Sequence, residues 1–118
     1  MRILRKNFLN KSQLMNIELI REYCMAMSDV TEDMPFGDDV VTFRRHGKIF
    51  CCINLNETKM VTLKCKPEYS EELRASYSSI EPAWHWNKKH WIQINFEGND
   101  IPDELILHLI DHAYSTIR

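Results

Sequence analysis

The chain has 118 residues, of which 44% are hydrophobic and 27% charged, and its formal net charge is −2. This length and composition predict one globular domain with a hydrophobic core of its own. A negative net charge excludes a general nucleic-acid binder, because contacts with phosphates need a basic surface. Any role of that kind depends on a local basic patch.

The charge is distributed unevenly along the chain. Residues 1–14 contain no acidic side chain, and we predict that they form a basic N-terminal extension of a domain spanning residues 15–118. The basic residues of this extension are Arg2, Arg5, Lys6 and Lys11. An extension of this kind either meets phosphates or is a loosely docked end, and chain termini favour the second interpretation.

The cysteines and the hydropathy pattern indicate the compartment. None of the cysteines has the C-x-x-C spacing of a zinc knuckle or a redox site, so we expect buried, reduced thiols and a cytoplasmic protein. They are Cys24, Cys51, Cys52 and Cys65. No apolar run approaches the roughly 20 residues of a membrane span, so no membrane partner is expected.

The first predicted elements are a helix and a loop. Apolar residues at helical spacing predict a helix over residues 16–28, with Asn16 as its N-cap. Residues 31–39 are predicted to be a loop that contains Pro35-Phe36-Gly37 and several acidic residues. The spacing of these acids does not match a calcium-binding EF-hand loop, so a solvated acidic loop is the better interpretation.

Three strands follow, over residues 40–43, 48–55 and 58–65. His46-Gly47 suits a two-residue hairpin turn between the first two, because glycine accepts a positive φ and histidine tolerates one. Strict alternation in the second strand puts Cys51 on one face, with Phe50 and Cys52 on the other. Alternation in the third strand predicts a sheet with one face toward solvent.

The second half of the chain predicts a helix from Pro67, a hairpin and a last helix from Pro102. The hairpin contains all three tryptophans, and its turn is Asn87-Lys88-Lys89. Its arms are predicted over residues 84–86 and 91–96, with Trp86 exposed and Trp91 packed in or against the core. The expected fold is therefore α+β, with a single antiparallel sheet of about five strands in the order α-β-β-β-α-β-β-α.

The histidines are candidates for catalysis and metal binding. His108 and His112 have metal-ligand spacing, but they lie opposite the apolar stripe of the last helix, and a solvated face explains them better. His85 and His90 could act as acid and base, or bind a metal with Cys51 or Cys52, yet no third ligand stands at a diagnostic spacing. Nucleophile motifs and phosphate-binding glycine loops are also absent. We therefore predict no enzyme, no cofactor and no metal.

Two basic hairpins give the sharper functional hypothesis. Arg44, Arg45 and Lys48 lie on the first hairpin, and Lys88 and Lys89 on the second. If both turns project from the same edge of the sheet, they form a basic surface that could follow phosphates, with neighbouring aromatic and polar groups near bases or sugars. The alternative is that these charges are ordinary solvated turns and that the tryptophans belong to the core.

Several segments together resemble the MmcQ/YjbR family of small bacterial domains. They are Pro35-Phe36-Gly37, Gly47-Lys48-Ile49-Phe50, Leu63-Lys64-Cys65-Lys66-Pro67-Glu68, Pro82-Ala83 and Asn87-Lys88-Lys89-His90-Trp91. The resemblance covers about residues 15–117. It implies a "double-wing" α+β fold, likened to frataxin-type domains, and a DNA-binding role predicted for the family. By position, the wings would be residues 44–48 and 87–90, with Trp91 as the signature aromatic residue.

Two positions depart from the family pattern. Trp86 replaces the methionine expected before Asn-Lys-Lys, and His112-Ala113-Tyr114 stands where the family usually has serine before tyrosine. We therefore predict a non-enzymatic DNA-binding or regulatory domain that uses two basic hairpins, or alternatively a protein- or small-ligand-binding module built on the tryptophan-rich hairpin. The predicted nucleic-acid-binding residues are Arg44, Arg45, Lys48, Trp86, Asn87, Lys88, Lys89 and His90.

Overall fold

A computed structural model describes residues 15–56, 59–97 and 100–118, so the predicted extension over residues 1–14 lies outside the described residues. The described elements, in chain order, are α2 (Ile17–Met25), β1 (Val30–Asp33), β2 (Val40–Arg45), β3 (Lys48–Asn54), β4 (Met60–Lys64), α3 (Pro67–Ser76), β5 (Ile80–Pro82), β6 (Trp91–Asn95) and α4 (Asp103–Ser115). The predicted fold class and element order are confirmed, with one additional strand, β1. No helix in the described part of the chain is long and apolar enough to cross a membrane.

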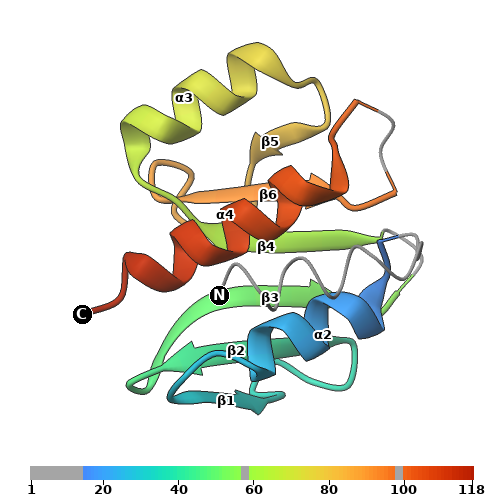
Figure 1. Cartoon of the computed structure of the whole chain (residues 1–118), viewed down its shortest axis with the longest axis vertical. Coiled ribbons are helices and arrows are strands. Elements are labelled where there is room, and N and C mark those ends of the chain that lie inside the picture. Colours follow the sequence, from blue (N-terminus) through green and yellow to red (C-terminus); the bar gives the residue numbers. More distant parts are fainter. Residues whose placement is uncertain (1–14, 57–58, 98–99) are drawn as a thin grey trace.

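The strands form one six-stranded antiparallel sheet in the order β1-β2-β3-β4-β6-β5. Helices α2 and α4 lie across one face, and α3 lies beside α4 toward the β5 edge (Figure 1). One continuous core fills the space between sheet and helices, with Ile53, Leu63, Ile94, Leu109 and Ile110 among its buried residues. The opposite face of the sheet, which none of the described helices covers, is called the open face below.

Helix α2 begins as the sequence predicts. The side-chain oxygen of Asn16 accepts a hydrogen bond from the backbone N–H of Leu19 at 2.8 Å, which satisfies one of the donors at the helix start. The helix buries Leu19, Ile20, Tyr23 and Cys24. It ends at Met25, earlier than residue 28, and Asp29, with a positive φ of 63°, leads the chain into β1.

The predicted loop over residues 31–39 is wrong in its first part, because β1 pairs with β2 there. The register joins Val30 to Arg45 and Asp33 to Thr42. Strand β1 is an edge strand whose residues alternate between half-buried and exposed, and it contains two acidic residues. Charged residues are common on edge strands, where they oppose pairing with other chains. Because they interrupt the alternation of apolar residues, the sequence pattern did not predict this strand.

The β2–β3 hairpin turns at His46 and Gly47, both with positive φ (53° and 78°), which confirms the predicted two-residue turn. A register shift between Phe43 and Arg44 leaves one extra residue on β3. Phe50 therefore points toward the helices, where its ring meets that of Tyr114 edge-on at 5.7 Å. The prediction that Phe50 lies opposite Cys51 is wrong, since the Cys51 thiol also faces the helices and contacts Cys24 of α2.

The predicted strand arm over residues 84–86 is also wrong. Strand β5 ends at Pro82, and residues 83–90 form a connection to β6 that contains two successive turns. The backbone N–H of Trp86 donates to the carbonyl of Ala83 at 3.1 Å, and that of His90 donates to the carbonyl of Asn87 at 3.0 Å. These amides are used within turns and cannot join a strand ladder, whereas the predicted turn at Asn87-Lys88-Lys89 is present.

Candidate functional site

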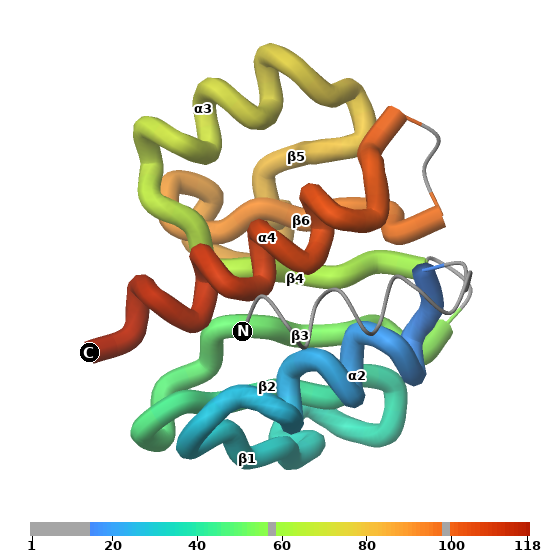
Figure 2. The backbone as a smooth tube through the Cα atoms, in the orientation of Figure 1, coloured from blue at the N-terminus to red at the C-terminus, as the bar shows by residue number. Residues whose placement is uncertain are grey.

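The two basic turns lie at the same end of the sheet. Residues 46–47 connect β2 to β3 there, and the β4–β6 pairing of Lys64 with Trp91 puts the 83–90 connection at that end too (Figure 2). Three strand spacings of about 4.8 Å separate the two turns, or about 14 Å across the sheet. The geometric condition of the two-hairpin hypothesis is therefore met.

Additional basic side chains gather at this end. Lys64 is the last residue of β4, Lys66 precedes α3, and Arg118 follows α4. We call the set the basic end of the sheet, and its residues are Lys48, Lys64, Lys66, Lys88, Lys89 and Arg118. Acidic residues also lie here, because Asp29 directly precedes β1 and Glu68 is in the first turn of α3. The connection 34–39 and the described residues 100–102, which hold further acidic residues, lie at the opposite end (Figure 1).

Both predicted arginines of the first hairpin have partners within the fold. Nε of Arg44 lies 3.2 Å from a carboxylate oxygen of Asp33, and its Nη1 donates to the carbonyl of Gly47 at 3.0 Å. A hydrogen bond from Thr42 and the nearby Arg44 hold the pKa of the Asp33 carboxyl below its usual value. Asp33 is therefore charged at neutral pH and offsets the charge of Arg44.

Arg45 is held by the end of α4. Its Nη1 donates to the carbonyls of Tyr114 at 3.1 Å and Ile117 at 3.3 Å. Its guanidinium carbon lies 4.0 Å from the centre of the Tyr114 ring. The carbonyl groups at a helix C-terminus are negative in character and attract a cation. Arg45 thus joins the hairpin to α4, and its charge points into the protein.

The lysines of the two turns are arranged differently from these arginines. Lys48, Lys88 and Lys89 are exposed, and among the described residues none of them forms an ion pair with a carboxylate. Nζ of Lys88 lies 4.5 Å from the centre of the Trp84 ring. These three side chains are available to a ligand in solvent.

The exposed tryptophan is Trp84, and not Trp86 as the sequence predicted. Trp84 is 55% exposed, whereas Trp86 is half-buried. The Trp86 ring packs at a tilt against the Trp91 ring, with 4.4 Å between centres, and forms a T-shaped pair with the Phe36 ring at 5.8 Å. Trp91 is half-buried, within the predicted range. Phe36 lies 50 positions from Trp86 in the chain, so its contact could not be read from the sequence around the turn.

A cleft of about 290 Å³ lies at the basic end, between the end of β4, the 83–90 connection and the C-terminal end of α4. Its lining contains no acidic side chain and consists of Lys64, Cys65, Lys66, Pro67, His90, Ser115, Thr116 and Arg118. His90 is the one member of this lining that belongs to the predicted site. The sequence analysis missed Lys64, Lys66 and Arg118, which come from three separate elements. The sequence signal for the two lysines was the segment Lys64-Cys65-Lys66, which lies between the end of a strand and a proline that starts a helix.

The histidines do not form one catalytic group. His90 lines the cleft at the basic end, whereas His85 lines a separate pocket on the open face. The solvated-face prediction is wrong for His112, whose Nε2 accepts from the Lys66 N–H at 3.2 Å and whose ring lies 4.9 Å from Tyr69. Burial and the nearby Lys66 lower its pKa. Within the described residues, no three histidine, cysteine or acidic side chains are placed to hold a metal ion.

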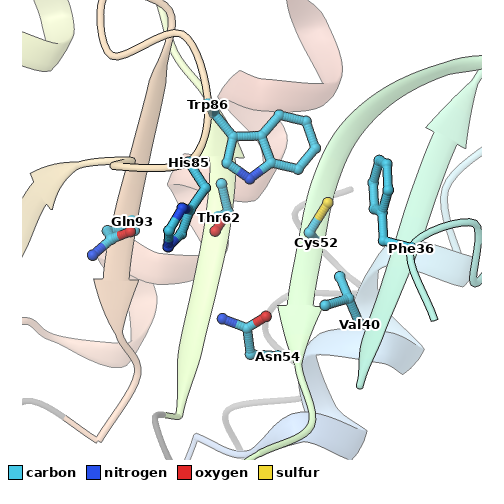
Figure 3. Close-up of a pocket in the computed structure, with 8 residues that line it drawn as sticks. All are labelled: Phe36, Val40, Cys52, Asn54, Thr62, His85, Trp86 and Gln93. Atoms are coloured by element: carbon cyan, nitrogen blue, oxygen red, sulfur yellow. The ribbon is translucent and has the colours of Figure 1, made fainter. Parts of the chain in front are cut away.

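The open face carries a pocket of about 470 Å³ that the sequence analysis did not predict (Figure 3). Its floor is formed by strand residues, and its rim by the connections 34–39 and 83–90. The floor residues are Val40, Cys52, Asn54, Thr62 and Gln93, and the rim residues are Phe36, His85 and Trp86. The signal in the sequence was the set of polar residues that alternate with the core residues of β4 and β6.

We predict that the cysteines resist modification in the folded protein. All four are buried, burial raises the pKa of the Cys65 thiol to about 11, and burial raises the pKa of Cys52 further still. A thiol with a pKa of 11 has about 200-fold less thiolate at pH 8 than an ordinary cysteine. Ellman's reagent at pH 8 should therefore react rapidly only after denaturant is added, and a thiol that reacts rapidly in the native protein would contradict this prediction.

The fold and the matched residues define the class of protein. A family model described as YjbR matches residues 25–116, and the chain belongs to that family. The resemblance to the MmcQ/YjbR family is thus confirmed.

Two bacterial relatives illustrate the family. The chain is 30% identical over 101 residues to the uncharacterised protein YjbR of Escherichia coli strain K12, which covers 85% of each chain. It is 40% identical over 58 residues to the uncharacterised protein YyaQ of Bacillus subtilis strain 168, about half of each chain. Neither name specifies an activity.

Solved structures share the fold. The crystal structure of the DUF419-domain protein DR2400 from Deinococcus radiodurans has a TM-score of 0.81 and 28% identity, covering 88% of this chain and 79% of that one. A crystal structure from Pseudomonas syringae has a TM-score of 0.73 and 28% identity, covering 88% of this chain and all of that one. Function must therefore be argued from the geometry of this chain.

Proposed function

We propose that this protein binds DNA through the basic end of its sheet, where it contacts the phosphate backbone. The observation that carries the proposal is the cleft beside the second lysine-bearing turn, because its lining contains Lys64, Lys66 and Arg118 and no acidic residue. Backbone contacts of this kind give affinity and position without reading a sequence. The role is non-enzymatic.

The contact residues in this proposal differ in part from those in the sequence prediction. Lys48, Lys88 and Lys89 are exposed to solvent and reach the phosphates, while Lys64 and Arg118 line the cleft at the same end of the sheet. Arg45 supports the hairpin from inside and makes no contact with DNA. Trp84, which is exposed beside Lys88, is the aromatic side chain best placed to stack on an unpaired base.

The charge distribution also supports the proposal. The protein's net charge of −2 predicts weak binding to DNA. However, many of the acidic residues lie at the end of the sheet opposite the basic end, away from the proposed contact with DNA. Asp29 and Glu68, at the basic end itself, limit the local potential. We therefore expect an affinity that is low at physiological salt, with three to five phosphate contacts and a log–log salt slope of about −3 to −4.5.

The double substitution Lys88→Glu with Lys89→Glu tests the proposal. Two phosphate contacts are lost and repulsion is introduced, so binding to labelled duplex or single-stranded DNA should weaken at least about tenfold at low salt, and the salt slope should fall by about 2. Fluorescence anisotropy across a salt series measures both quantities. Because both side chains are exposed, thermal unfolding should be unchanged.

The matched control compares single substitutions with the same change of charge. Lys59 lies at the opposite end of the sheet, where its carbonyl accepts from Phe96. Lys59→Glu should leave DNA affinity nearly unchanged, while Lys88→Glu alone should reduce it. Equal losses in the two variants would mean that net charge, not the basic end, governs binding. Absence of any DNA binding by the wild-type protein at low salt would overturn the proposal.

A further inference from the structure

The open-face pocket has the size and charge of a small-molecule site. Its volume of about 470 Å³ falls within the roughly 300–1,000 Å³ that is typical of such sites. None of its eight lining residues is lysine, arginine, aspartate or glutamate. A charged ligand would have no counter-charge there and would lose its hydration, so the pocket favours an uncharged occupant.

The aromatic rim of the pocket favours a flat occupant. Trp86 has aromatic neighbours on two sides, since its ring packs at a tilt of 36° against Trp91 at 4.4 Å and forms a T-shaped pair with Phe36 at 5.8 Å. The rim therefore offers rigid aromatic surfaces that need no rearrangement to receive a ring. Aromatic pairs in stacked or edge-to-face geometry contribute about 0.5–1.5 kcal/mol beyond the area they bury.

The floor of the pocket presents both donors and acceptors. Nε2 of Gln93 donates to Glu81 at 2.9 Å, and its carbonyl oxygen lies on the pocket side (Figure 3). The Asn54 amide and the Thr62 hydroxyl each combine a donor with an acceptor. Amide side chains pair well with the edges of nitrogen heterocycles, as asparagine and glutamine do with adenine.

We propose that the open-face pocket binds a flat, uncharged nitrogen heterocycle of nucleobase size. The ring could belong to a free base or nucleoside, or to a nucleic-acid strand whose phosphates lie on Lys88 and Lys89. A strand could reach both places, because the 83–90 connection contains these two lysines as well as the rim residues His85 and Trp86. The inference does not rest on the proposed DNA binding, and it gives the small-ligand alternative a defined site.

The test is a titration of the full chain with adenosine, guanosine, cytidine and thymidine. Binding is measured by calorimetry and by tryptophan fluorescence, excited at the red edge of the tryptophan absorption band. We expect at least one nucleoside to bind with a Kd below about 1 mM. Asn54→Leu should weaken that binding at least about tenfold, because a leucine of similar size cannot replace the amide. Thr62→Val, which removes only a hydroxyl, provides a second and structurally milder variant.

The control variant is Asn95→Leu, which makes the same chemical change on β6 outside the pocket lining. It should bind nucleosides as the wild type does. The inference is overturned if no nucleoside binds up to about 10 mM, or if Asn54→Leu and Thr62→Val bind as tightly as the wild type while remaining folded by circular dichroism.

A trinucleotide of the preferred base distinguishes the two sources of the ring. Tighter binding than the nucleoside, with the gain lost in the Lys88→Ala, Lys89→Ala double variant, identifies a base within a strand. Equal binding of trinucleotide and nucleoside identifies a free small molecule. Either result supports the pocket, and nucleoside binding in the absence of any DNA binding would remove the proposed function while leaving the pocket site intact.

Discussion

Replacing Phe50 with alanine is expected to lower the free energy of unfolding by about 3–5 kcal/mol. The Phe50 side chain is fully buried, and its ring packs edge-on against Tyr114 of α4 at 5.7 Å. Truncation leaves a cavity between sheet and helix and removes the support on one side of Tyr114. Urea unfolding, monitored by tryptophan fluorescence, measures the change. An unaltered m-value shows that the wild type and the variant unfold between the same two states.

Phe36→Ala is the matched control for this substitution. The same atoms are removed, but Phe36 is 59% exposed, so the expected loss is below about 1 kcal/mol. A similar loss at both positions would mean that Phe50 is not packed between β3 and α4. The result therefore also tests the bulge that turns Phe50 toward the helices.

The bulge shows where sequence analysis of the fold stops. Alternation correctly predicted that one face of β4 is turned away from the core, because each side chain of a regular strand faces away from its neighbour. It failed at Phe50, since one extra residue in β3 reverses the alternation, and the extra residue is defined only by pairing with β2. Strand β1 was missed for a related reason, because its partner lies 9 to 15 positions away and its own pattern is polar.

The candidate site was predictable in part. The two turns could be located from Gly47 and from Asn87-Lys88-Lys89, because turn chemistry is local. Their common position at one end of the sheet needed the pairing of Lys64 with Trp91, which no local pattern contains. The open-face pocket was out of reach for the same reason, since its rim combines Phe36 with Trp86.

Arg45→Met is expected to lower the free energy of unfolding by about 2–3 kcal/mol. Two hydrogen bonds from a charged donor to the Tyr114 and Ile117 carbonyls disappear, and so does the contact with the Tyr114 ring. A hydrogen bond from a charged group contributes about 1.5–3 kcal/mol, and a cation–π contact about 0.5–2. The buried Nε of Arg45 has no hydrogen-bond partner in the described structure, so its removal offsets part of the loss. Methionine keeps the apolar stem, and denaturant unfolding measures the difference.

Lys48→Met separates the structural role of Arg45 from a role in binding. It removes the same charge from the same hairpin, but the Lys48 side chain is exposed, so its stability change should stay within about 0.5 kcal/mol. DNA affinity should show the reverse order, with a clear loss for Lys48→Met and little change for Arg45→Met at temperatures where both are folded. If Arg45→Met instead lost DNA binding at unchanged stability, its guanidinium would have to leave the α4 carbonyls in the complex. The hairpin would then be a moving part of the interface and not a fixed support.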